Sequence, residues 1–319
     1  MIRFSSFPLV GALASVLLAG AVQAESYRIE APVHYATETV DGLTIFYREA
    51  GDPAKPTLVL LHGFPASSQQ YRDVLASPLA KDYHLIAPDY PGFGDSSFPA
   101  PDKFVYSFDH LAQITDKFLE QRGIVRYALM VQDYGAPIGF RIAAKHPERI
   151  TALIIQNGNA YEEGIGAKGW GPVLDYWKHK TPELEQQVAE AAFTLDGVKA
   201  ERTAGARHPE TILPDGWNLD YLKISRPGER RAQLDLFYDY QNNLKLYPAW
   251  QKYFRDYQPP TLIVWGKHDP FFLEAGAEGY KRDLKNLDYN ILDTGHFALE
   301  EEAPQIIEKM GQFLGKTLR

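Results

Sequence analysis

The stretch Val131-Gln132-Asp133-Tyr134-Gly135-Ala136-Pro137 decides how the fold of this chain is interpreted. It continues the apolar run that begins at Tyr127 and leads directly into a segment of helical character, 137–146. A tight turn between a buried strand and a helix is the shape of a nucleophile elbow, where the pattern G-x-S-x-G usually places a serine. Asp133 stands at the serine position, and Gly135 keeps the glycine that lets the helix start close to the sheet. The sequence therefore predicts a carboxylate where a nucleophile would sit.

The apolar runs on either side of this turn predict a mostly parallel sheet. Short continuous apolar runs, typical of strands buried on both faces, alternate with segments of helical spacing such as 108–121. This alternation indicates a parallel sheet covered by helices on both sides, in which ligands bind beyond the carboxyl ends of the strands. The predicted strands are 43–48, 57–61, 84–87, 127–131, 151–156, 261–265 and 289–292.

Two later strand ends supply candidate partners for Asp133. The strand 261–265 is followed by a loop that contains Asp269, and the strand 289–292 is followed by Asp293 and then His296. The order nucleophile, acid, histidine is the one that α/β hydrolases use. We therefore expect a catalytic triad of Asp133, His296 and Asp269. Asp293 is the rival acid, and Asp269 is preferred because it follows a separate strand.

These motifs together resemble the α/β-hydrolase superfamily over residues 40–314. His62-Gly63-Phe64-Pro65 matches the oxyanion-hole loop of the branch that holds epoxide hydrolases and haloalkane or haloacid dehalogenases, and 89–96 (DYPGFGDS) matches its loop after the next strand. The nucleophile of that branch is an aspartate. The resemblance implies an α/β-hydrolase fold: a mostly parallel central sheet, flanked by helices, with a helical cap inserted after the sixth strand.

The chemistry of a carboxylate agrees with the resemblance. A carboxylate is already ionised at neutral pH, so it needs no base to attack a saturated carbon in an epoxide or a carbon–halogen bond. Attack by Asp133 gives an alkyl-enzyme ester. His296, oriented by Asp269, would then activate water against this ester, while the backbone N–H groups of Phe64 and Tyr134 hold the oxyanion. In a purely structural interpretation, Asp133 would instead be a turn residue capping the following helix.

The side chains around the nucleophile favour an epoxide over a halide. Haloalkane dehalogenases of this branch typically have a tryptophan after the nucleophile and an asparagine or second tryptophan as halide donors, and fluoroacetate-type enzymes have an arginine there. Tyr134 and Phe64 stand at these positions, although Trp170 and Trp177 in the cap are potential substitutes. Epoxide hydrolases instead use two cap tyrosines to hydrogen-bond the opening oxygen. The predicted substrate-binding residues are Tyr176 (with Tyr161 as its alternative), Tyr238, Tyr240, Trp177 and His62, the last expected to be structural rather than catalytic.

The expected function is epoxide hydrolysis to a vicinal diol. The alternatives are a haloalkane or haloacid dehalogenase, another carbon-bond or ester hydrolase of the same fold, and a non-catalytic binding module, since the fold alone does not decide. An esterase would be expected to have serine at position 133. A binding module would not require Asp133, Asp269 and His296 at the strand ends where a triad stands. The sequence holds no metal-ligand cluster and no glycine-rich phosphate loop, so no metal and no cofactor are expected.

Composition and the N-terminus set the cellular context. Residues 1–24 combine one early charge, an apolar run and small residues before Glu25, which is typical of a secretory signal peptide; a membrane-anchoring helix is the alternative. The expected location is periplasmic or secreted.

We expect a core of 25–159 and 257–319 and a helical cap of 160–256, with a separate domain as the alternative. The net charge of −8 argues against nucleic acid or an anionic membrane surface. The expected partner is a small apolar electrophile, and the expected state a monomer or homodimer.

Overall fold

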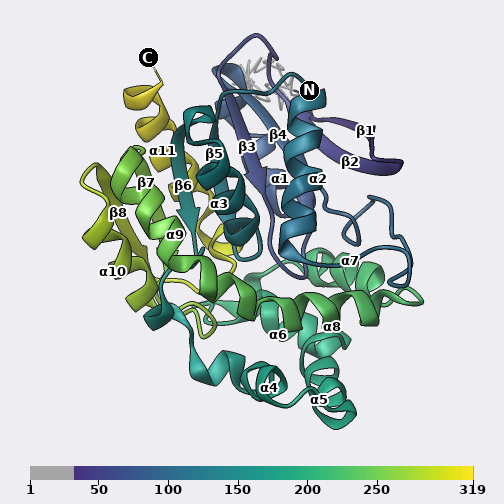
Figure 1. Ribbon diagram of the computed structural model, residues 1–319. Helices are drawn as coiled ribbons and strands as arrows, with labels where there is room; N and C mark the ends of the chain where they lie inside the picture. Colours follow the sequence, from purple (N-terminus) through teal and green to yellow (C-terminus); the bar gives the residue numbers. More distant parts are fainter. Residues whose placement is uncertain (1–31, 319) are drawn as a thin grey trace, which may run out of the picture.

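An eight-stranded sheet forms the centre of the computed structural model, which describes residues 32–318 (Figure 1). The predicted signal peptide, 1–24, lies outside the described residues. The strand order is β1-β2-β4-β3-β5-β6-β7-β8; β1 and β4 each pair with β2 antiparallel, and the remaining pairs are parallel. The strands are β1 (His34–Val40), β2 (Leu43–Ala50), β3 (Thr57–Leu61), β4 (His84–Pro88), β5 (Tyr127–Gln132), β6 (Ile150–Gln156), β7 (Thr261–Gly266) and β8 (Leu287–Leu292).

The predicted fold class, a mostly parallel sheet flanked by helices, is confirmed by this topology. Each predicted strand falls on an observed one, and β1 is the strand that the sequence analysis missed. The helices are α1 (Arg72–Leu75), α2 (Phe108–Gln121), α3 (Gly135–Lys145), α4 (Ala167–Lys178), α5 (Pro182–Ala192), α6 (Leu195–Thr203), α7 (Pro214–Ile224), α8 (Glu229–Asp239), α9 (Gln241–Tyr257), α10 (Glu274–Asp283) and α11 (Ala298–Thr317).

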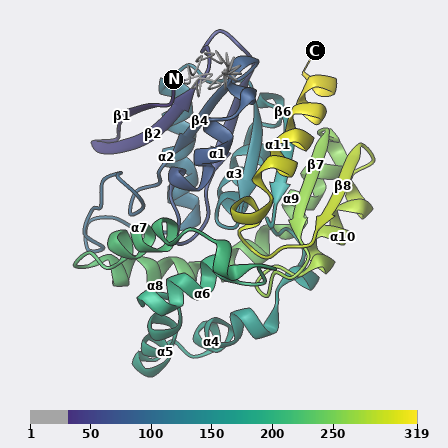
Figure 2. The same cartoon turned by 180° about the vertical axis from the view of Figure 1, so that it is seen from behind.

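The sheet separates two hydrophobic cores, because successive side chains of a strand point to opposite faces. In β3, Leu58 and Leu60 face the core shared with α1 and α11, whereas Val59 and Leu61 face the core shared with α2, α3 and the cap. Figure 1 shows α2, α3 and α9 in front of the sheet, and Figure 2, from behind, shows α1 and α11 on the opposite face. Burial on both faces explains why the parallel strands are continuous apolar runs.

The chain between β6 and β7 forms a helical layer beyond the carboxyl ends of the strands. It contains α4 to α9, and in both ribbon views α4, α5, α6 and α8 lie below the sheet (Figures 1 and 2). The last helix, α9, runs back from this layer and packs against α3 and α10. The cap therefore covers the edge of the sheet at which the predicted triad residues stand. Among the helices of residues 32–318, none combines the length and apolarity that crossing a bilayer requires.

Candidate active site

The turn between β5 and α3 has the strained backbone expected of an elbow. Asp133 adopts a φ of 49°, in the left-handed region that side chains other than glycine rarely enter. The following helix starts against the neighbouring strand, since a Cβ on Gly135 would lie 2.1 Å from the carbonyl oxygen of Leu61. Glycine is therefore required at position 135. The turn lifts the Asp133 side chain to the cap side of the sheet.

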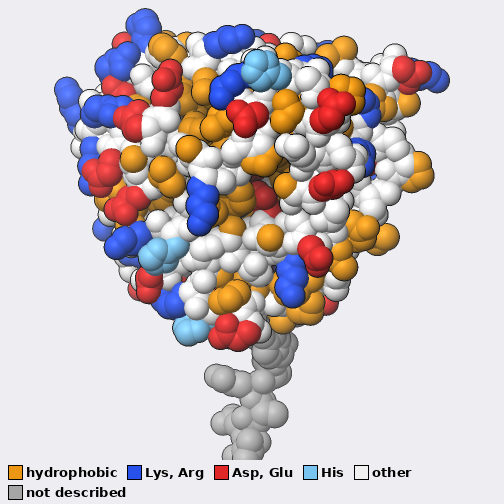
Figure 3. Space-filling view, turned by 90° about the horizontal axis from the view of Figure 1, so that it is seen from below, with side chains coloured by type: hydrophobic (Ala, Val, Ile, Leu, Met, Phe, Trp, Pro, Cys, Tyr) orange, Lys and Arg blue, Asp and Glu red, His pale blue; other side chains and the backbone are white. Residues whose placement is uncertain are grey.

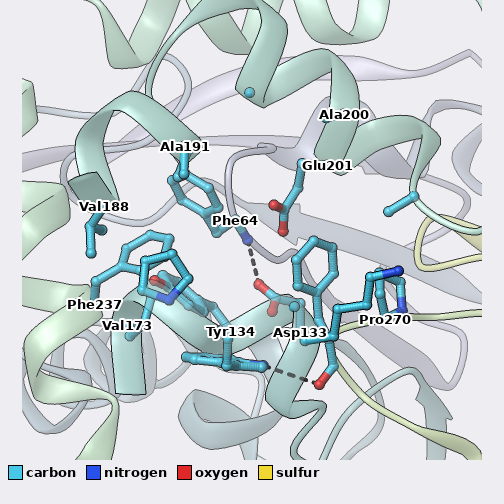
Figure 4. Close-up of a pocket in the computed structure, with 18 residues that line it drawn as sticks. Phe64, Asp133, Tyr134, Val173, Val188, Ala191, Ala200, Glu201, Phe237 and Pro270 are labelled. Atoms are coloured by element: carbon cyan, nitrogen blue, oxygen red, sulfur yellow. Dashed lines mark hydrogen bonds between the residues drawn. The ribbon is translucent and has the colours of Figure 1, made fainter. Parts of the chain in front are cut away.

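Backbone N–H groups hold the carboxylate of Asp133. The N–H of Phe64 donates a hydrogen bond to Asp133 Oδ1 over 2.6 Å, and Figure 4 draws this bond. Burial raises the pKa of Asp133 to about 6, while His296 and the N–H groups of Phe64 and Tyr134 oppose that rise by stabilising the charged form. The carboxylate is thus the ionised species at neutral pH. Phe64 and Tyr134, the two residues predicted for the oxyanion hole, meet at this group.

His296 and Asp269 form a buried pair. His296 Nδ1 lies 2.7 Å from Asp269 Oδ2, and both side chains are fully buried. The other oxygen of Asp269 accepts hydrogen bonds from the backbone N–H groups of Phe271 (2.8 Å) and Phe272 (3.1 Å). The carboxylate is therefore fixed in the orientation that holds the imidazole. Asp293, the rival acid, lies elsewhere: its Oδ1 is 2.7 Å from His268 Nε2, on the exposed surface.

Electrostatics give His296 a high proton affinity. Burial by itself would lower the pKa of His296, but the charge and hydrogen bond of Asp269, together with Asp133 and Glu201, outweigh burial and raise it to about 9. In the free protein the ring is therefore largely protonated at neutral pH. A general base needs the neutral imidazole, so His296 must release this proton before it can take one from water.

Two residues that the sequence analysis passed over complete the buried pair. Asn157, directly after β6, donates from Nδ2 to Asp269 Oδ2 over 2.7 Å and accepts the N–H of Gly266. The side-chain amide of Gln132 lies 3.1 Å from His296 Nε2 and is itself hydrogen-bonded to Gln70. The rule that ligands bind beyond strand ends would have pointed to Asn157. Gln132 carried no such signal.

A cavity of about 320 Å³ opens above the Asp133 carboxylate. Figure 3 views the molecule from the cap side, where a hollow with largely hydrophobic walls is visible. Aromatic and aliphatic side chains from the core and from α4, α5 and α8 dominate the wall, and the ionisable groups in it are Asp133, Tyr134, Lys168 and Glu201. The apolar members that surround Asp133 in Figure 4 include Phe64, Val173, Val188, Ala191, Phe237 and Pro270. The cavity suits a small apolar molecule.

The predicted substrate-binding tyrosines pack around this cavity, outside its wall. The hydroxyl of Tyr176 donates to Glu185 over 2.9 Å, and Tyr238 packs against the Tyr176 ring with centroids 5.2 Å apart. Tyr240 is buried beside Tyr134 and Trp170, and Tyr161 donates to Asp283 over 2.7 Å. The structure therefore differs from the expectation: Tyr176 and Tyr238, on α4 and α8, contact other parts of the cap, whereas Tyr161 and Tyr240 contact residues of the core.

His62 and Trp177 also lie outside the cavity wall. Burial lowers the pKa of His62 to about 3, and its ring stacks on Tyr90 with centroids 4.2 Å apart. The indole N–H of Trp177 donates to the carbonyl of Phe237 over 2.8 Å. Both residues therefore pack around the site and do not line the cavity. Trp170 does line the cavity, but its indole N–H donates to the carbonyl of Phe271 over 3.1 Å.

One group of potential metal ligands exists among residues 32–318, and it is already balanced by cations. Asp116, Glu120 and His146 gather on the outside of the core. Arg149 pairs with Asp116 at 3.0 Å and with Glu120 at 2.8 Å, and Lys145 lies 3.1 Å from Asp116. These contacts account for the cluster as an ion-pair network.

The chain is similar to known hydrolases over most of its length. A family model described as alpha/beta hydrolase fold matches residues 56–303. An uncharacterized hydrolase of Saccharomyces cerevisiae is 43% identical over 272 residues, covering 85% of this chain and 93% of the relative. A haloalkane dehalogenase of Mycolicibacterium paratuberculosis is 34% identical over 276 residues, covering 84% and 86%. Epoxide hydrolase 4 of Mus musculus is 27% identical over 275 residues, covering 83% and 74%.

Proposed function

The chain belongs to the alpha/beta hydrolase fold family, and on this premise we propose that it is an epoxide hydrolase with Asp133 as its nucleophile. Water would add to a small apolar epoxide in two steps, through an ester on Asp133, to give a vicinal diol. His296 would be the base of the second step and Asp269 its partner. The relationship to both epoxide hydrolases and haloalkane dehalogenases supports an enzyme of this chemical class.

The contact between Phe64 and Asp133 carries the proposal. In a serine hydrolase the oxyanion hole waits for an oxygen of the substrate, whereas here the Phe64 N–H already binds Asp133 Oδ1 at 2.6 Å. The second oxygen would attack the epoxide carbon, and Oδ1 would become the carbonyl oxygen of the ester. When water attacks that ester, the negative charge develops on Oδ1, where the N–H groups of Phe64 and Tyr134 stabilise it.

The hydrogen bonds made by the indole groups of Trp170 and Trp177 favour an epoxide over a halide as the substrate. A leaving halide needs N–H donors, and Trp170 and Trp177 were the candidates in the cap. Both indole N–H groups donate to backbone carbonyls, of Phe271 and Phe237, and only Trp170 reaches the cavity. Freeing either donor would break its hydrogen bond, which costs ~0.5–1.5 kcal/mol; the carbonyl of Phe271 would keep the backbone N–H of Gly166 as a donor. The hydrogen bonds of these two indoles therefore count against the dehalogenase alternative, because they occupy the halide donors that the sequence offered in the cap.

Intact mass measured on His296→Gln protein tests the proposal. Without its base the protein should stall after the first step and retain the ester on Asp133. An aryl epoxide adds its whole mass, whereas a bromoalkane adds only its alkyl part, so the two reactions are read from the same spectrum. Asp133→Asn in the same background is the control, because it removes the nucleophile and changes the side-chain volume little.

The outcomes separate the alternatives. An epoxide adduct that disappears with Asp133→Asn supports epoxide hydrolysis, and an alkyl adduct from the bromoalkane alone would assign the protein to the dehalogenases. Turnover of an epoxide by the wild type without an adduct in His296→Gln would contradict the covalent route through Asp133.

We further propose that the protein is exported and acts on small molecules outside the cytoplasm. The signal-like pattern of residues 1–24 supports export, and the apolar cavity supports a small hydrophobic substrate. Fractionation of cells that produce the full chain, with N-terminal sequencing of the product, tests export. Cleavage before Glu25 is the expected result, and an uncleaved chain in the cytoplasm would contradict it.

A further inference from the structure

The acidic side chain that the cap contributes to the cavity wall is Glu201, on α6. Figure 4 shows its carboxyl group pointing into the cavity, toward the carboxyl group of Asp133. Among the described residues, no side chain forms a hydrogen bond or ion pair with this carboxyl group. An unpaired acid beside a nucleophilic carboxylate needs an explanation, because the two would repel each other if both were charged.

Helix α6 holds Glu201 firmly in this position. The next residue, Arg202, is fully buried and pairs with Asp220 at 2.6 Å and with Glu300 at 2.5 Å. Just past the helix, the carbonyl of Ala204 accepts a hydrogen bond from the backbone N–H of His296 over 2.9 Å. The acid is thus fixed relative to the histidine of the site as well as to the nucleophile, as a group that acts on the substrate should be.

The surroundings of Glu201 favour its protonated form. Burial is the main cause that raises its pKa, to about 8; the charges of Asp133 and Asp269 add to the rise, and His296 opposes it. Lys168 is the other charged group in the cavity wall, and its side chain is exposed. At neutral pH the cavity therefore holds one ionised carboxylate, Asp133, and one carboxylic acid, Glu201, in facing walls. Two acids whose environments separate their protonation states are typical of a nucleophile and its acid partner.

We propose that Glu201 is the proton donor for the epoxide oxygen, the role for which the sequence suggested cap tyrosines. The inference rests on the proposed epoxide hydrolysis. It follows from three observations: Glu201 faces Asp133 across the cavity, its carboxyl group has no other partner among residues 32–318, and the predicted tyrosines lie outside the wall. A substrate between the two carboxyl groups would meet the nucleophile on one side and the acid on the other.

The protons balance over the cycle. Asp133 forms a bond to one epoxide carbon, the bond from that carbon to the ring oxygen breaks, and the oxygen takes the proton of Glu201. Water then adds to the ester carbonyl, with His296 taking a proton from the water and returning it to the departing alcohol oxygen. Hydrolysis of the ester regenerates Asp133 as an acid, which ionises, and this proton restores Glu201. The sum is one epoxide and one water converted to one diol.

The test compares the rate of ester formation with and without the acid. In the His296→Gln background, an aryl epoxide is added at neutral pH and the adduct is followed by intact mass over time. Glu201→Gln keeps the shape of the side chain and removes its acidic proton. Asp196→Asn, an exposed carboxylate on the same helix, is the matched control. Glu201→Asp retains an acid on a shorter side chain.

Glu201→Gln is expected to slow ester formation by roughly 10²-fold or more, the usual contribution of a positioned acid. Asp196→Asn should leave the rate within about twofold, and Glu201→Asp should recover part of it, since its carboxylic acid still donates. Equal rates with and without Glu201 would overturn this inference and leave epoxide hydrolysis intact. Absence of an adduct in His296→Gln itself would instead overturn the proposed function, and this inference with it.

Discussion

Arg202 of cap helix α6 forms a buried ion pair with Glu300 of core helix α11, with Nη1 2.5 Å from Oε1. Arg202 also pairs with Asp220 of α7, and Arg72 reaches Glu300 from the core over 2.7 Å. The Arg202 guanidinium lies 4.5 Å from the ring centre of Phe297, which directly follows His296. One network therefore joins the cap helix that carries Glu201 to the loop that carries His296.

Removing Arg202 should destabilise the protein strongly. Arg202→Met leaves Asp220 and Glu300 as buried carboxylates with fewer partners, and breaking such a buried pair costs ~3–5 kcal/mol. Urea unfolding followed by circular dichroism measures the loss of free energy of unfolding. Arg207→Met is the control. The Arg207 side chain is 41% exposed, so its ion pair with Glu302 should contribute less than ~1 kcal/mol to stability. Equal losses for the two variants would contradict the assigned role of the network.

Asp269→Asn should block the second half of the reaction. The amide can no longer stabilise the protonated imidazole, so hydrolysis of the ester should fall by roughly 10²–10⁴-fold while ester formation continues. Wild-type protein mixed with an epoxide would show little adduct by intact mass, and Asp269→Asn would accumulate it. Asp293→Asn tests the rival acid; because Asp293 is paired with His268 on the surface, it should leave turnover unchanged. A stalled ester in Asp293→Asn alone would reverse the assignment.

The sequence predicted the core of the molecule well because burial on both faces leaves a clear signal. Strands β3 to β7 are continuous apolar runs; the oxyanion loop follows β3, the elbow follows β5 and Asp269 follows β7, whereas His296 follows the edge strand β8. β1 was missed because His34–Val40 has largely exposed or half-exposed positions and no apolar run. Patterns that arise from burial were therefore recognised, and a strand without an apolar run was not.

The cap was predicted as a helical layer, but not the direction of its side chains. Tyr176 and Tyr238 resemble cavity residues in sequence, and the structure turns them toward Glu185 and toward each other. Glu201 stands in the polar run Lys199-Ala200-Glu201-Arg202, which resembles a solvent-facing turn of helix. Helix orientation in the cap depends on tertiary contacts such as the Arg202 network, which periodicity does not encode.

The rate of ester formation should depend on pH through both carboxyl groups of the cavity. Asp133 attacks only when ionised, so the rate should fall as pH drops below its pKa of about 6. Glu201 donates only when protonated, so the rate should also fall as pH rises above its pKa of about 8. Because Asp133, Glu201 and His296 interact electrostatically, the pKa values that the two limbs report belong to the three groups together. We expect the rate of ester formation, measured in single turnovers from about pH 5 to about pH 10, to give a bell-shaped curve against pH.

The alkaline limb distinguishes the two carboxyl groups in that measurement. Glu201→Gln removes the group that must be protonated, so its lower rate should no longer fall above pH 8. The acid limb should remain, because Asp133 is unchanged. An alkaline limb that persists in Glu201→Gln would point to another donor, and Lys168 and Tyr134 are the ionisable cavity groups to replace next.

Trp170→Phe tests whether the indole in the cavity wall serves the substrate or the fold. Its N–H donates to the carbonyl of Phe271, which also accepts the backbone N–H of Gly166. The phenyl ring removes one of these two hydrogen bonds, so the free energy of unfolding should fall by ~0.5–1.5 kcal/mol. Trp217→Phe, at a half-buried position on α7, should change stability by no more than ~0.5 kcal/mol. Because the indole is already engaged, the ratio of ester formation from an epoxide to that from a bromoalkane should not change. A selective loss of the bromoalkane reaction would show that Trp170 exchanges its backbone partner for the halide, and would favour the dehalogenase alternative.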